Sequence, residues 1–433
     1  MTSNDSKNQA FVWIWLPGET EPVVAGKLTV EGKQLLFNYG KSYLVRRNAI
    51  AIYDPELPLQ AGEIPLLAGL DMPGCIRDAS PDAWGRRVII NKKLGLNGME
   101  TDSAQLDELT YLLESGSDRI GALDFQHSAT EYIPRSAANA SLDELMQSAE
   151  RVEKGLLLSP GLGQALQQGT SIGGARPKVQ IETDDKKYIA KFSSVTDLYS
   201  VVKTEYIAMR LGALAGLDVA PVSLRRSMHK DVLLIERFDR IPSEGGWQRK
   251  AMVSVLAMLS LDEMMGRYAS YEDVAELVRH RFTDVSVTLR ELFSRMVFNI
   301  LCGNTDDHAR NHAAFWDGQA LKLTPAYDIC PQSRTGNEAS QAMLIVGDDR
   351  MSRVSSCLNA APNFLLSREE AIIIVESLLR SVIENWKLSC EEAALVPADR
   401  ALLWGRQFLN PYAFEDLSDD VAYLKLLAED ARA

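Results

Sequence analysis

The sequence lacks long apolar runs. Nowhere in its 433 residues is there an uninterrupted apolar stretch of about 18 residues, the minimum for a membrane-spanning helix. The stretch "MTSNDSKNQAFVWIW" is polar and then briefly apolar, and it has neither the basic start nor the hydrophobic core of a signal peptide. We therefore expect a cytoplasmic protein without a membrane span.

Positive charge is also scarce. The chain has 46 lysines and arginines against 59 aspartates and glutamates, which gives a formal net charge of −13. Such a chain lacks the broad electropositive surface that supplies non-specific affinity for nucleic acid. We therefore expect any contact with DNA to be indirect, through another protein.

Cysteine pairs are missing as well. The five cysteines are scattered without a C-x-x-C motif, so neither a zinc ribbon nor a disulfide framework is indicated, and free thiols are expected. They are Cys75, Cys302, Cys330, Cys357 and Cys390. The composition, 46% hydrophobic and 24% charged, is typical of a folded globular protein with more than one domain.

The first half of the chain changes from a strand pattern to a helix pattern. Short apolar runs between about residues 11 and 58 predict strands and hairpins; they are "FVWIWL", "VVAGKLTV", "QLLFNY" and "AIAIYD". From about residue 81 to 154 the pattern is helical. In "SPDAWGRRVIINKKL" we expect Ser80 to be the N-cap and Pro81 to lie in the first turn.

The second half begins with a predicted hairpin, "KVQIETDDKKYIAKF", in which two alternating runs flank the turn "TDDK". A helix ending at Gly216 should follow, and then two strands in "VSLRRSMHKDVLLIERFDR". After about residue 250 we expect helices, interrupted by one hairpin around Asp317 and Gly318.

The densest group of polar residues surrounds that last hairpin. Asp306 and Asn311 are five residues apart in "GNTDDHARN", and Asp328 follows the hairpin in "LTPAYDIC". Protein kinases use this order: an aspartate that accepts the proton of the substrate hydroxyl, then an asparagine and a second aspartate that hold magnesium. Oxygen ligands of this kind suit Mg²⁺.

Two other interpretations of this segment stay open. The polar residues could be an ordinary solvated loop with a turn. His308 and His312, four residues apart, could instead join the aspartates in a transition-metal site for hydrolysis, although the glutamate of an H-E-x-x-H motif is missing.

Two motifs upstream would bind phosphate. In "QQGTSIGGARPKVQI", Gly173 and Gly174 would let the backbone approach a polyphosphate, and Lys178 would add positive charge. In "KKYIAKF", Lys191 lies inside an apolar strand, where an ammonium group needs a partner; in kinases this lysine meets phosphate and a helix glutamate, here Glu205. Otherwise the first motif is a plain loop, and Lys191 faces water.

Together the motifs follow the order of a kinase chain, and the backbone from Glu236 to Phe238 in "VLLIERFDR" could hydrogen-bond an adenine. We therefore predict an α+β, protein-kinase-like bilobal fold. Its expected parts are a β-rich N-terminal subdomain with a helical extension (residues 1–110), a region like a kinase N-lobe (111–240) and an all-α C-lobe (241–433).

The sequence resembles the HipA-type serine/threonine kinases, toxins of bacterial type II toxin–antitoxin modules. The resemblance extends over nearly the whole chain through "SPDAWGRRVI", "SIGGARPK", "YIAKF", "LLIERFDR", "GNTDDHARN" and "LTPAYDIC". It implies an ATP- and Mg²⁺-dependent enzyme. The implied roles are catalysis for Asp306, magnesium binding for Asn311 and Asp328, and phosphate contacts for His308, Lys178 and Lys191.

The resemblance also implies regulation. Ser171 lies where the family has a serine that the kinase phosphorylates on itself, after which the loop leaves the ATP site; Thr170 beside it leaves the site ambiguous. The chain departs from the family at Asp307, where a small residue is common and the aspartate adds charge near the phosphates, and at Arg310, where lysine is frequent.

Partners are implied in the same way. Family members are neutralised by a small helix-turn-helix antitoxin (HipB-like) that binds operator DNA, and a well-known target is an aminoacyl-tRNA synthetase, glutamyl-tRNA synthetase. Two alternatives stay open: a small-molecule kinase, and a non-catalytic nucleotide-binding partner of an antitoxin. The intact set of lysines and magnesium ligands speaks against the second.

Overall fold

A computed structural model describes residues 8–94, 106–135, 141–154, 156, 166, 170–172, 174, 176–193, 197, 199–228, 230–334 and 336–432. The chain divides into two compact units, each described by itself below. Unit 1 comprises Met1–Asp197, Arg225–Asp262 and Phe315–Gln319, and unit 2 comprises Leu198–Leu224, Glu263–Ala314 and Ala320–Ala433. The three-part division expected from the sequence stays a prediction.

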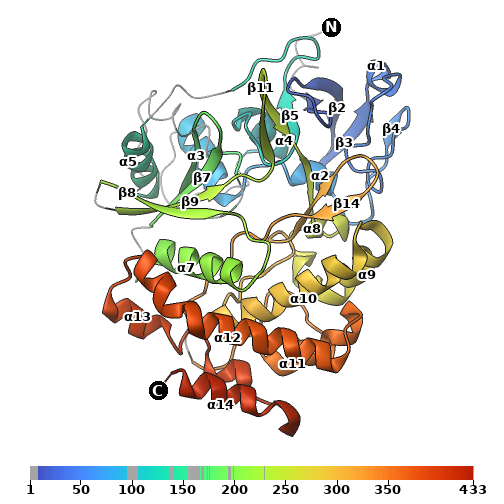
Figure 1. Ribbon diagram of the computed structural model, residues 1–433. Helices are drawn as coiled ribbons and strands as arrows, with labels where there is room; N and C mark the ends of the chain where they lie inside the picture. Colours follow the sequence, from blue (N-terminus) through green and yellow to red (C-terminus); the bar gives the residue numbers. More distant parts are fainter. Residues whose placement is uncertain are drawn as a thin grey trace. The chain divides into compact units, whose positions relative to one another are not determined.

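Unit 1 begins with a five-stranded sheet in the order β4-β3-β2-β1-β5 (Figure 1). The strands are β1 (Gln9–Ile14), β2 (Val23–Glu31), β3 (Gln34–Tyr39), β4 (Glu63–Ile64) and β5 (Leu123–Gln126). The alternating runs produce the expected antiparallel pairs of β1 with β2 and of β2 with β3. Gly26 lies where these strands approach closely, because a Cβ there would overlap the Asn38 carbonyl.

The run "AIAIYD", residues 49–54, was expected to be a strand, and this prediction is wrong: the described backbone there is irregular. Tyrosine hydroxyls take the place of a strand partner. The Tyr43 hydroxyl donates to the Ile50 carbonyl (2.7 Å), and the Ile52 N–H donates to the Tyr39 hydroxyl (2.9 Å). A segment whose backbone groups form hydrogen bonds with side chains in this way needs no neighbouring strand to satisfy them.

A second sheet in unit 1 has the order β6-β7-β9-β8. Its strands are β6 (Lys178–Glu182), β7 (Lys187–Phe192), β8 (Val222–Ser227, which crosses the division between the units) and β9 (Lys230–Glu236). Helices α3 (Ala83–Leu94) and α5 (Leu142–Glu153) pack on one face of this sheet around Trp84 and Val179. The predicted hairpin and the two following strands are confirmed.

Helix α3 begins later than expected. Asp82, not Ser80, accepts the first helical hydrogen bond, from Arg86 N–H (2.9 Å). The Ser80 hydroxyl is buried and has no hydrogen-bond partner among the described residues. The prediction of Ser80 as the N-cap is therefore wrong, and the carboxylate of Asp82 has another use, described below.

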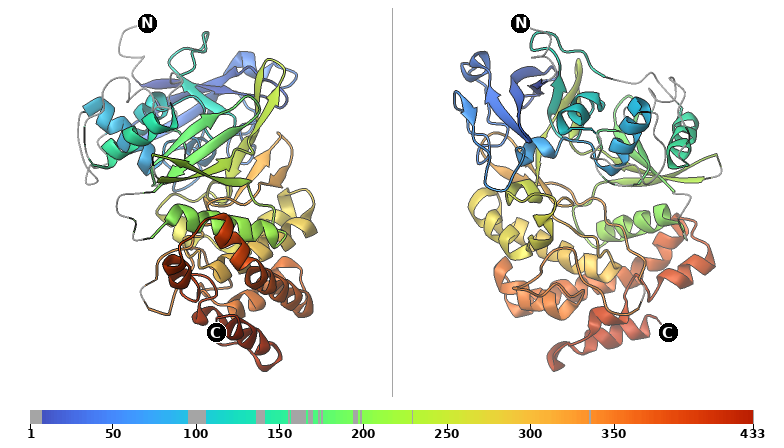
Figure 2. Two further views of the ribbon diagram at one scale, coloured as in Figure 1. Left: turned by 60° about the vertical axis from the view of Figure 1, so that its left-hand side comes forward. Right: turned by 180° about the vertical axis from the view of Figure 1, so that it is seen from behind.

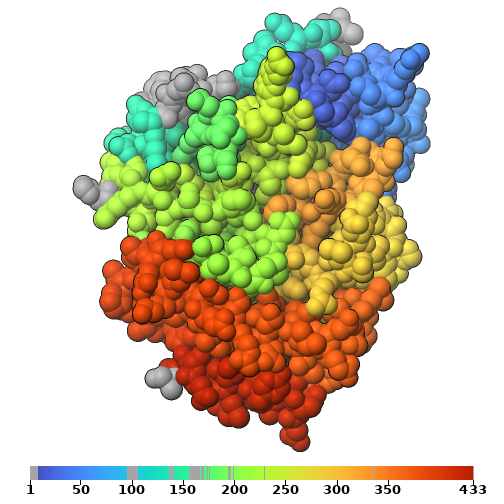
Figure 3. Space-filling view, viewed as in Figure 1, coloured from blue at the N-terminus to red at the C-terminus, as the bar shows by residue number. Residues whose placement is uncertain are grey.

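Unit 1 is completed by short elements. Helix α4 (Glu108–Glu114) lies in the region expected to be helical. The sequence did not predict the others, which are α1 (Lys41–Leu44), α2 (Gly74–Arg77), β10 (Arg240–Ser243), β11 (Gly246–Arg249), β12 (Ala251–Ser254) and α8 (Val255–Met258). The tip of the β10–β11 hairpin forms a projection on unit 1 (Figure 3).

Unit 2 consists mainly of helices (Figure 2). They are α7 (Val201–Leu214), η4 (Met265–Tyr268), α9 (Tyr271–Arg281), α10 (Val285–Cys302), α11 (Val354–Ala360), η5 (Ala361–Phe364), α12 (Arg368–Glu392), α13 (Pro397–Leu403), η6 (Pro411–Phe414), η7 (Asp419–Val421) and α14 (Tyr423–Asp430). The long helix α12 packs against both α7 and α10. Within the described parts of the chain, no helix is long and apolar enough to cross a membrane.

The last predicted hairpin is confirmed as β13 (Ala313–Trp316) and β14 (Leu321–Leu323). Its tip, Phe315–Gln319, groups with unit 1, while the segments before and after it belong to unit 2. The polar residues predicted to be catalytic lie just before and just after this hairpin.

The core of unit 1 allows a stability test at Trp84. This side chain is fully buried, and its indole N–H donates to the Lys178 carbonyl (3.1 Å). We expect Trp84→Ala to lower the free energy of unfolding by about 3–5 kcal/mol, measured by urea denaturation followed by circular dichroism. Val45→Ala, at a side chain that is 82% exposed, should change it by less than about 0.5 kcal/mol. Equal effects of the two changes would contradict this assignment of the core.

Candidate active site

The two lysines expected to bind phosphate are neighbours in unit 1. Lys178 and Lys191 are directly opposite each other in the antiparallel pair of β6 and β7, and both are more than nine-tenths buried. Directly opposed side chains share one face of a sheet, with Cβ atoms about 5 Å apart. Two ammonium groups on one face of a sheet can contact the same polyanion. The pair therefore fits a polyphosphate.

Gly174 lies against one of these lysines. Its φ is +104°, and a Cβ built there would overlap the Lys178 ammonium group, so only glycine fits. The Gly174 N–H donates to the Asp82 carboxylate, and its carbonyl accepts from Trp84 N–H (3.4 Å). This N–H thus points at a carboxylate of the chain itself. Gly173, the other glycine expected to bind nucleotide, lies outside the described residues.

Ser171, the expected modification site, is buried here, as is Thr170; their exposed fractions are 2% and 1%. The Ser171 hydroxyl donates to the Asp118 carbonyl (3.3 Å). The Thr170 hydroxyl accepts from Gly116 N–H (3.0 Å). A phosphoryl donor could reach Ser171 only after this segment had moved.

The segment expected to contact adenine lies at the end of β9, and two of its side chains contact other residues of unit 1. The Glu236 carboxylate pairs with the Lys186 ammonium group (2.7 Å). The Phe238 ring stands edge-on to the ring of Phe315 at a centroid distance of 5.9 Å. The backbone contact with adenine stays a prediction.

The loop expected to be catalytic begins where α10 ends in unit 2. Gly303 takes the left-handed conformation (φ +73°) that commonly closes a helix, and Asn304 N–H donates to the Asn299 carbonyl (2.8 Å). A Cβ on Gly303 would press into the backbone of Gln407. Glycine therefore fixes the direction in which the chain leaves the helix, three residues before Asp306.

Asn311 is held against the first part of this loop. Its side-chain NH₂ donates to the Asp306 carbonyl (3.1 Å), and its backbone N–H donates to the His308 carbonyl (2.8 Å). Because the NH₂ group is the donor, the amide oxygen is the atom that can serve as a ligand for a cation. The loop therefore orients Asn311 as a magnesium ligand requires.

Asp328 has a strained backbone. Its φ is +58°, which is uncommon for a residue other than glycine, and such strain is frequent at functional sites. The two residues before Asp328 are each held by a hydrogen bond. Ala326 N–H donates to the Asp218 carbonyl (2.7 Å), and the Tyr327 hydroxyl donates to the Arg310 carbonyl (2.7 Å).

The carboxylates of Asp306 and Asp328 are close enough for the charge of one to affect the pKa of the other. Burial raises the pKa of Asp306; His308 opposes this, and the carboxylates of Asp328 and Asp307 raise the pKa further. A raised pKa makes Asp306 a better proton acceptor. A divalent cation held by Asn311 and Asp328 would relieve the repulsion between the carboxylates, so these residues fit Mg²⁺.

Asp307 points into the interior of unit 2, where only 2% of the residue is exposed; the expectation that its charge lies near the phosphates stays a prediction. Its carboxylate accepts hydrogen bonds from the Tyr271 hydroxyl and from His312 Nε2 (2.8 Å). Burial alone would raise the pKa of Asp307, but His312 and Tyr271 hold it below its usual value. At this position, where the chain departs from the family, Asp307 thus belongs to a buried cluster of hydrogen-bonded side chains.

The hydrolytic metal site gains no support. His312 is occupied with Asp307, and across the described residues no group of three or more His, Cys, Asp or Glu side chains could hold a metal ion. At the other departure from the family, Arg310 pairs with Glu263 (2.6 Å).

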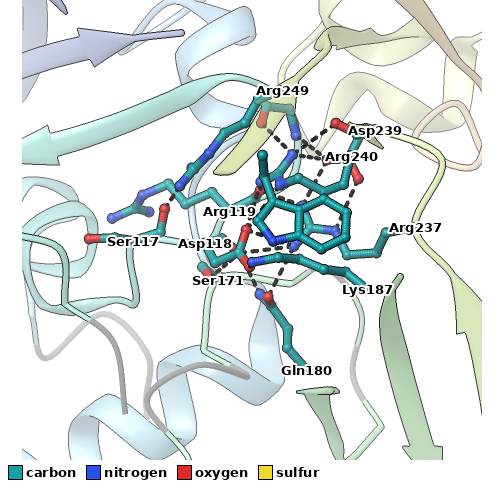
Figure 4. Close-up of polar contacts among 12 residues, drawn as sticks. Ser117, Asp118, Arg119, Ser171, Gln180, Lys187, Arg237, Asp239, Arg240 and Arg249 are labelled. Carbon is teal, nitrogen blue, oxygen red and sulfur yellow. Dashed lines mark hydrogen bonds and ion pairs between the residues drawn. The ribbon is translucent and has the colours of Figure 1, made fainter. Parts of the chain in front are cut away.

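Sequence reasoning missed the polar cluster around Asp118 in unit 1. Arg237 and Arg240, both fully buried, pair with this aspartate (Figure 4). A signal was available, because "RFDR" places three charged residues directly after a buried strand, where each needs a partner.

Comparison with known families matches two stretches of the chain. The model of the HipA N-terminal domain matches residues 15–126, and that of the HipA-like C-terminal domain matches residues 170–386. The chain belongs to the HipA family. Gly174, Lys178, Lys191 and the loop around Asp306 lie inside the second match.

Two curated relatives are similar over part of their length. "Putative kinase Y4mE" of Sinorhizobium fredii is 30% identical over 154 residues, 33% of this chain and 34% of the relative. The serine/threonine-protein kinase toxin HipA of Shewanella oneidensis is 24% identical over 203 residues, 41% of this chain and 47% of the relative. The matched stretches thus span less than half of these relatives.

A solved structure is similar over nearly its whole length. The complex of HipA, HipB and operator DNA from the toxin–antitoxin system of Shewanella oneidensis MR-1 matches with a TM-score of 0.64 and 18% identity, covering 97% of this chain and 95% of that chain. This likeness concerns the fold, and it confirms the predicted α+β, kinase-like class.

The Asp307 cluster predicts a pH-dependent stability. Because the pKa of Asp307 is lower in the folded chain, its contribution is present above the ordinary pKa of about 3.9 and is lost as the pH falls below it. We expect Asp307→Asn to lower the free energy of unfolding by about 3 kcal/mol at pH 7. This deficit relative to the unchanged chain should shrink below about pH 4. A deficit that does not change with pH would contradict the prediction.

Proposed function

We propose that this HipA-family chain is a protein serine/threonine kinase that uses ATP and Mg²⁺. The observation that carries the proposal is the opposed pair Lys178 and Lys191 in unit 1, two buried lysines on one face of a sheet, where both could contact one phosphate chain. Asp306, Asn311 and Asp328 of unit 2 supply the complementary chemistry.

Each residue would have one task. Asp306, with its raised pKa, would accept the proton of the substrate hydroxyl as that oxygen attacks the terminal phosphate. Lys178 and Lys191 would hold the phosphates and neutralise their charge. Asn311 and Asp328 would hold magnesium, which, when bound, neutralises charge that develops on the phosphates.

We propose further that the chain is the toxin of a toxin–antitoxin module. A small helix-turn-helix antitoxin would neutralise it, and contact with DNA would run through that partner. The names of the relatives and the net charge of −13 support this assignment. An aminoacyl-tRNA synthetase, glutamyl-tRNA synthetase by family resemblance, is the proposed target, and Ser171 is the proposed site of autophosphorylation.

The catalytic role of Asp306 is tested by Asp306→Asn, which removes the proton acceptor and keeps the side-chain shape. We expect incorporation of labelled phosphate from ATP into protein to fall about 100- to 10,000-fold. Mass spectrometry would locate the label, and Asp184→Asn, at an exposed turn between β6 and β7, is the matched control. Transfer to metabolites but never to protein would favour the small-molecule kinase instead.

Nucleotide binding is tested without catalysis by thermal unfolding. We expect saturating ATP and Mg²⁺ to raise the unfolding temperature of the unchanged chain by about 5 °C, because a ligand that binds only the folded state stabilises it. Lys178→Met should abolish this rise, whereas Lys27→Met, at an exposed position of β2, should keep it. A full rise in the Lys178 variant would argue against a phosphate contact there.

A further inference from the structure

Three large apolar side chains are exposed together on a short turn of unit 2. Met264, Met265 and Tyr268 have exposed fractions of 78%, 43% and 49%. The turn contains η4, and every residue of η4 is at least partly exposed. We call residues 264–268 the methionine turn. Isolated apolar side chains are ordinary on a protein surface, whereas a group of them in one place is typical of a binding site.

The methionine turn lies beside the loop that carries Asp306. Directly before the turn, Glu263 pairs with Arg310 (2.6 Å), which follows Asp306 by four positions. After the turn, the Tyr271 hydroxyl donates to the carboxylate of Asp307, the residue next to Asp306. Both contacts lie within unit 2. The turn is therefore fastened at both ends to the loop that is expected to be catalytic.

The backbone around the turn is also held by a segment later in the chain. Leu344 N–H donates to the Ala269 carbonyl (3.0 Å), and Tyr271 N–H donates to the Leu344 carbonyl (2.9 Å). The Arg350 guanidinium donates to the Arg267 carbonyl, which lies inside the turn (2.8 Å). These hydrogen bonds fix the backbone and leave the apolar side chains exposed. A surface that is ordered before it meets a partner loses less conformational entropy on binding.

The side chains of the turn are suited to an apolar partner. Methionine is flexible and polarisable, so two exposed methionines can adapt to large aliphatic or aromatic groups of different shape. Beside them the Arg267 guanidinium lies over the Tyr268 ring, 4.9 Å from its centroid. The phosphates of a nucleotide are anionic and would gain little from thioether groups. The surface therefore fits the other substrate, the one that carries the hydroxyl.

A polypeptide can contact the turn and Asp306 at the same time. An extended chain advances about 3.3 Å per residue, so a side chain a few positions from the acceptor hydroxyl lies well away from the reacting atoms. The pair of Glu263 and Arg310 links the turn to Asp306 over a similarly short run of residues. A small metabolite has its reacting group and no such extension. The arrangement therefore favours a protein acceptor.

We propose that the methionine turn is a docking surface for the protein substrate, and that it binds a large apolar side chain a few residues from the acceptor serine or threonine. This inference rests on the proposed function and deepens it, because it defines the chemistry of the acceptor beyond its hydroxyl. Met264, Met265 and Tyr268 determine specificity and do not touch the reacting atoms. Recognition of the substrate thus comes from unit 2, next to the residue that accepts the proton.

Synthetic peptides test the docking surface with a defined probe. Each peptide carries one central serine, and one flanking position at a time is leucine, methionine, phenylalanine or glutamine. We expect the full chain to phosphorylate peptides with an apolar residue at one particular position with a kcat/KM about 10-fold above that of the glutamine peptide. The double change Met264→Ser and Met265→Ser should remove this preference by raising KM, whereas Met264→Leu and Met265→Leu together should keep it.

A matched control changes exposed apolar residues elsewhere in unit 2. The double change Ile373→Ser and Leu426→Ser, at residues that are 62% and 60% exposed, should leave the preference for apolar peptides unchanged. Every variant should retain the rise in unfolding temperature with ATP and Mg²⁺. A retained rise shows that the chain is folded and binds nucleotide, so a lost preference then reports on the acceptor peptide.

Binding to the turn can also be measured without kinase activity. Hydrogen peroxide converts exposed methionines to sulfoxides, and mass spectrometry of the digested protein follows each methionine separately. We expect a saturating pool of the apolar peptides to slow the oxidation of Met264 several-fold relative to the same pool with glutamine at the flanking positions. Met228, which is 44% exposed in unit 1, should oxidise at the same rate with both pools.

The outcomes separate this inference from the proposed function. If the chain phosphorylates the peptides without an apolar preference, or if the double serine variant of the turn keeps the preference, the docking surface is refuted and the kinase assignment stands. If the chain transfers phosphate to no peptide or protein, the proposed function fails, and the oxidation rates decide whether the turn binds apolar peptide. Equal oxidation of Met264 with both pools would then overturn the docking surface as well.

Discussion

The pairing of buried charge around Asp118 is the constraint on which the organisation of unit 1 depends. Arg237 and Arg240 are fully buried, and a buried guanidinium group without a partner would be unstable. Asp118 comes from a loop more than a hundred positions earlier in the chain. Pairing the arginines therefore brings this distant loop to the end of β9, where the loop also forms hydrogen bonds with Thr170 and Ser171.

The two units carry groups of opposite charge, and each group indicates a ligand. In unit 1 Lys178 and Lys191 lie opposite each other on one face of a sheet, where both could contact a phosphate chain. In unit 2 burial and the carboxylates of Asp328 and Asp307 raise the pKa of Asp306, which a divalent cation would lower. A shifted pKa beside clustered charge is typical of a functional site rather than of packing.

Sequence patterns predicted the elements whose periodicity is local, and they failed where a side chain from elsewhere decides the structure. The β6–β7 hairpin and the helix ending at Gly216 follow from alternation and glycine. Residues 49–54 form an apolar run that also predicts a strand, but tyrosine hydroxyls take backbone hydrogen bonds of this segment. The spacing of Asp306, Asn311 and Asp328 could be read directly. The inward direction of Asp307 could not, since it depends on Tyr271, which lies 36 positions earlier.

Gly174 shows why a phosphate-binding motif cannot be judged from its glycines alone. Its N–H is already bonded to the Asp82 carboxylate, an anion supplied by the chain itself. A phosphate that replaced Asp82 as the acceptor of this N–H would exchange one charge-assisted hydrogen bond for another, and Asp82 would then need water or another partner. The free energy of binding gained would be only the difference between the two hydrogen bonds. In the proposed kinase the net attraction for nucleotide would therefore come mainly from charge, which in unit 1 means Lys178 and Lys191. Asp82, at the start of α3, would then help to set how strongly the glycine-rich motif binds phosphate.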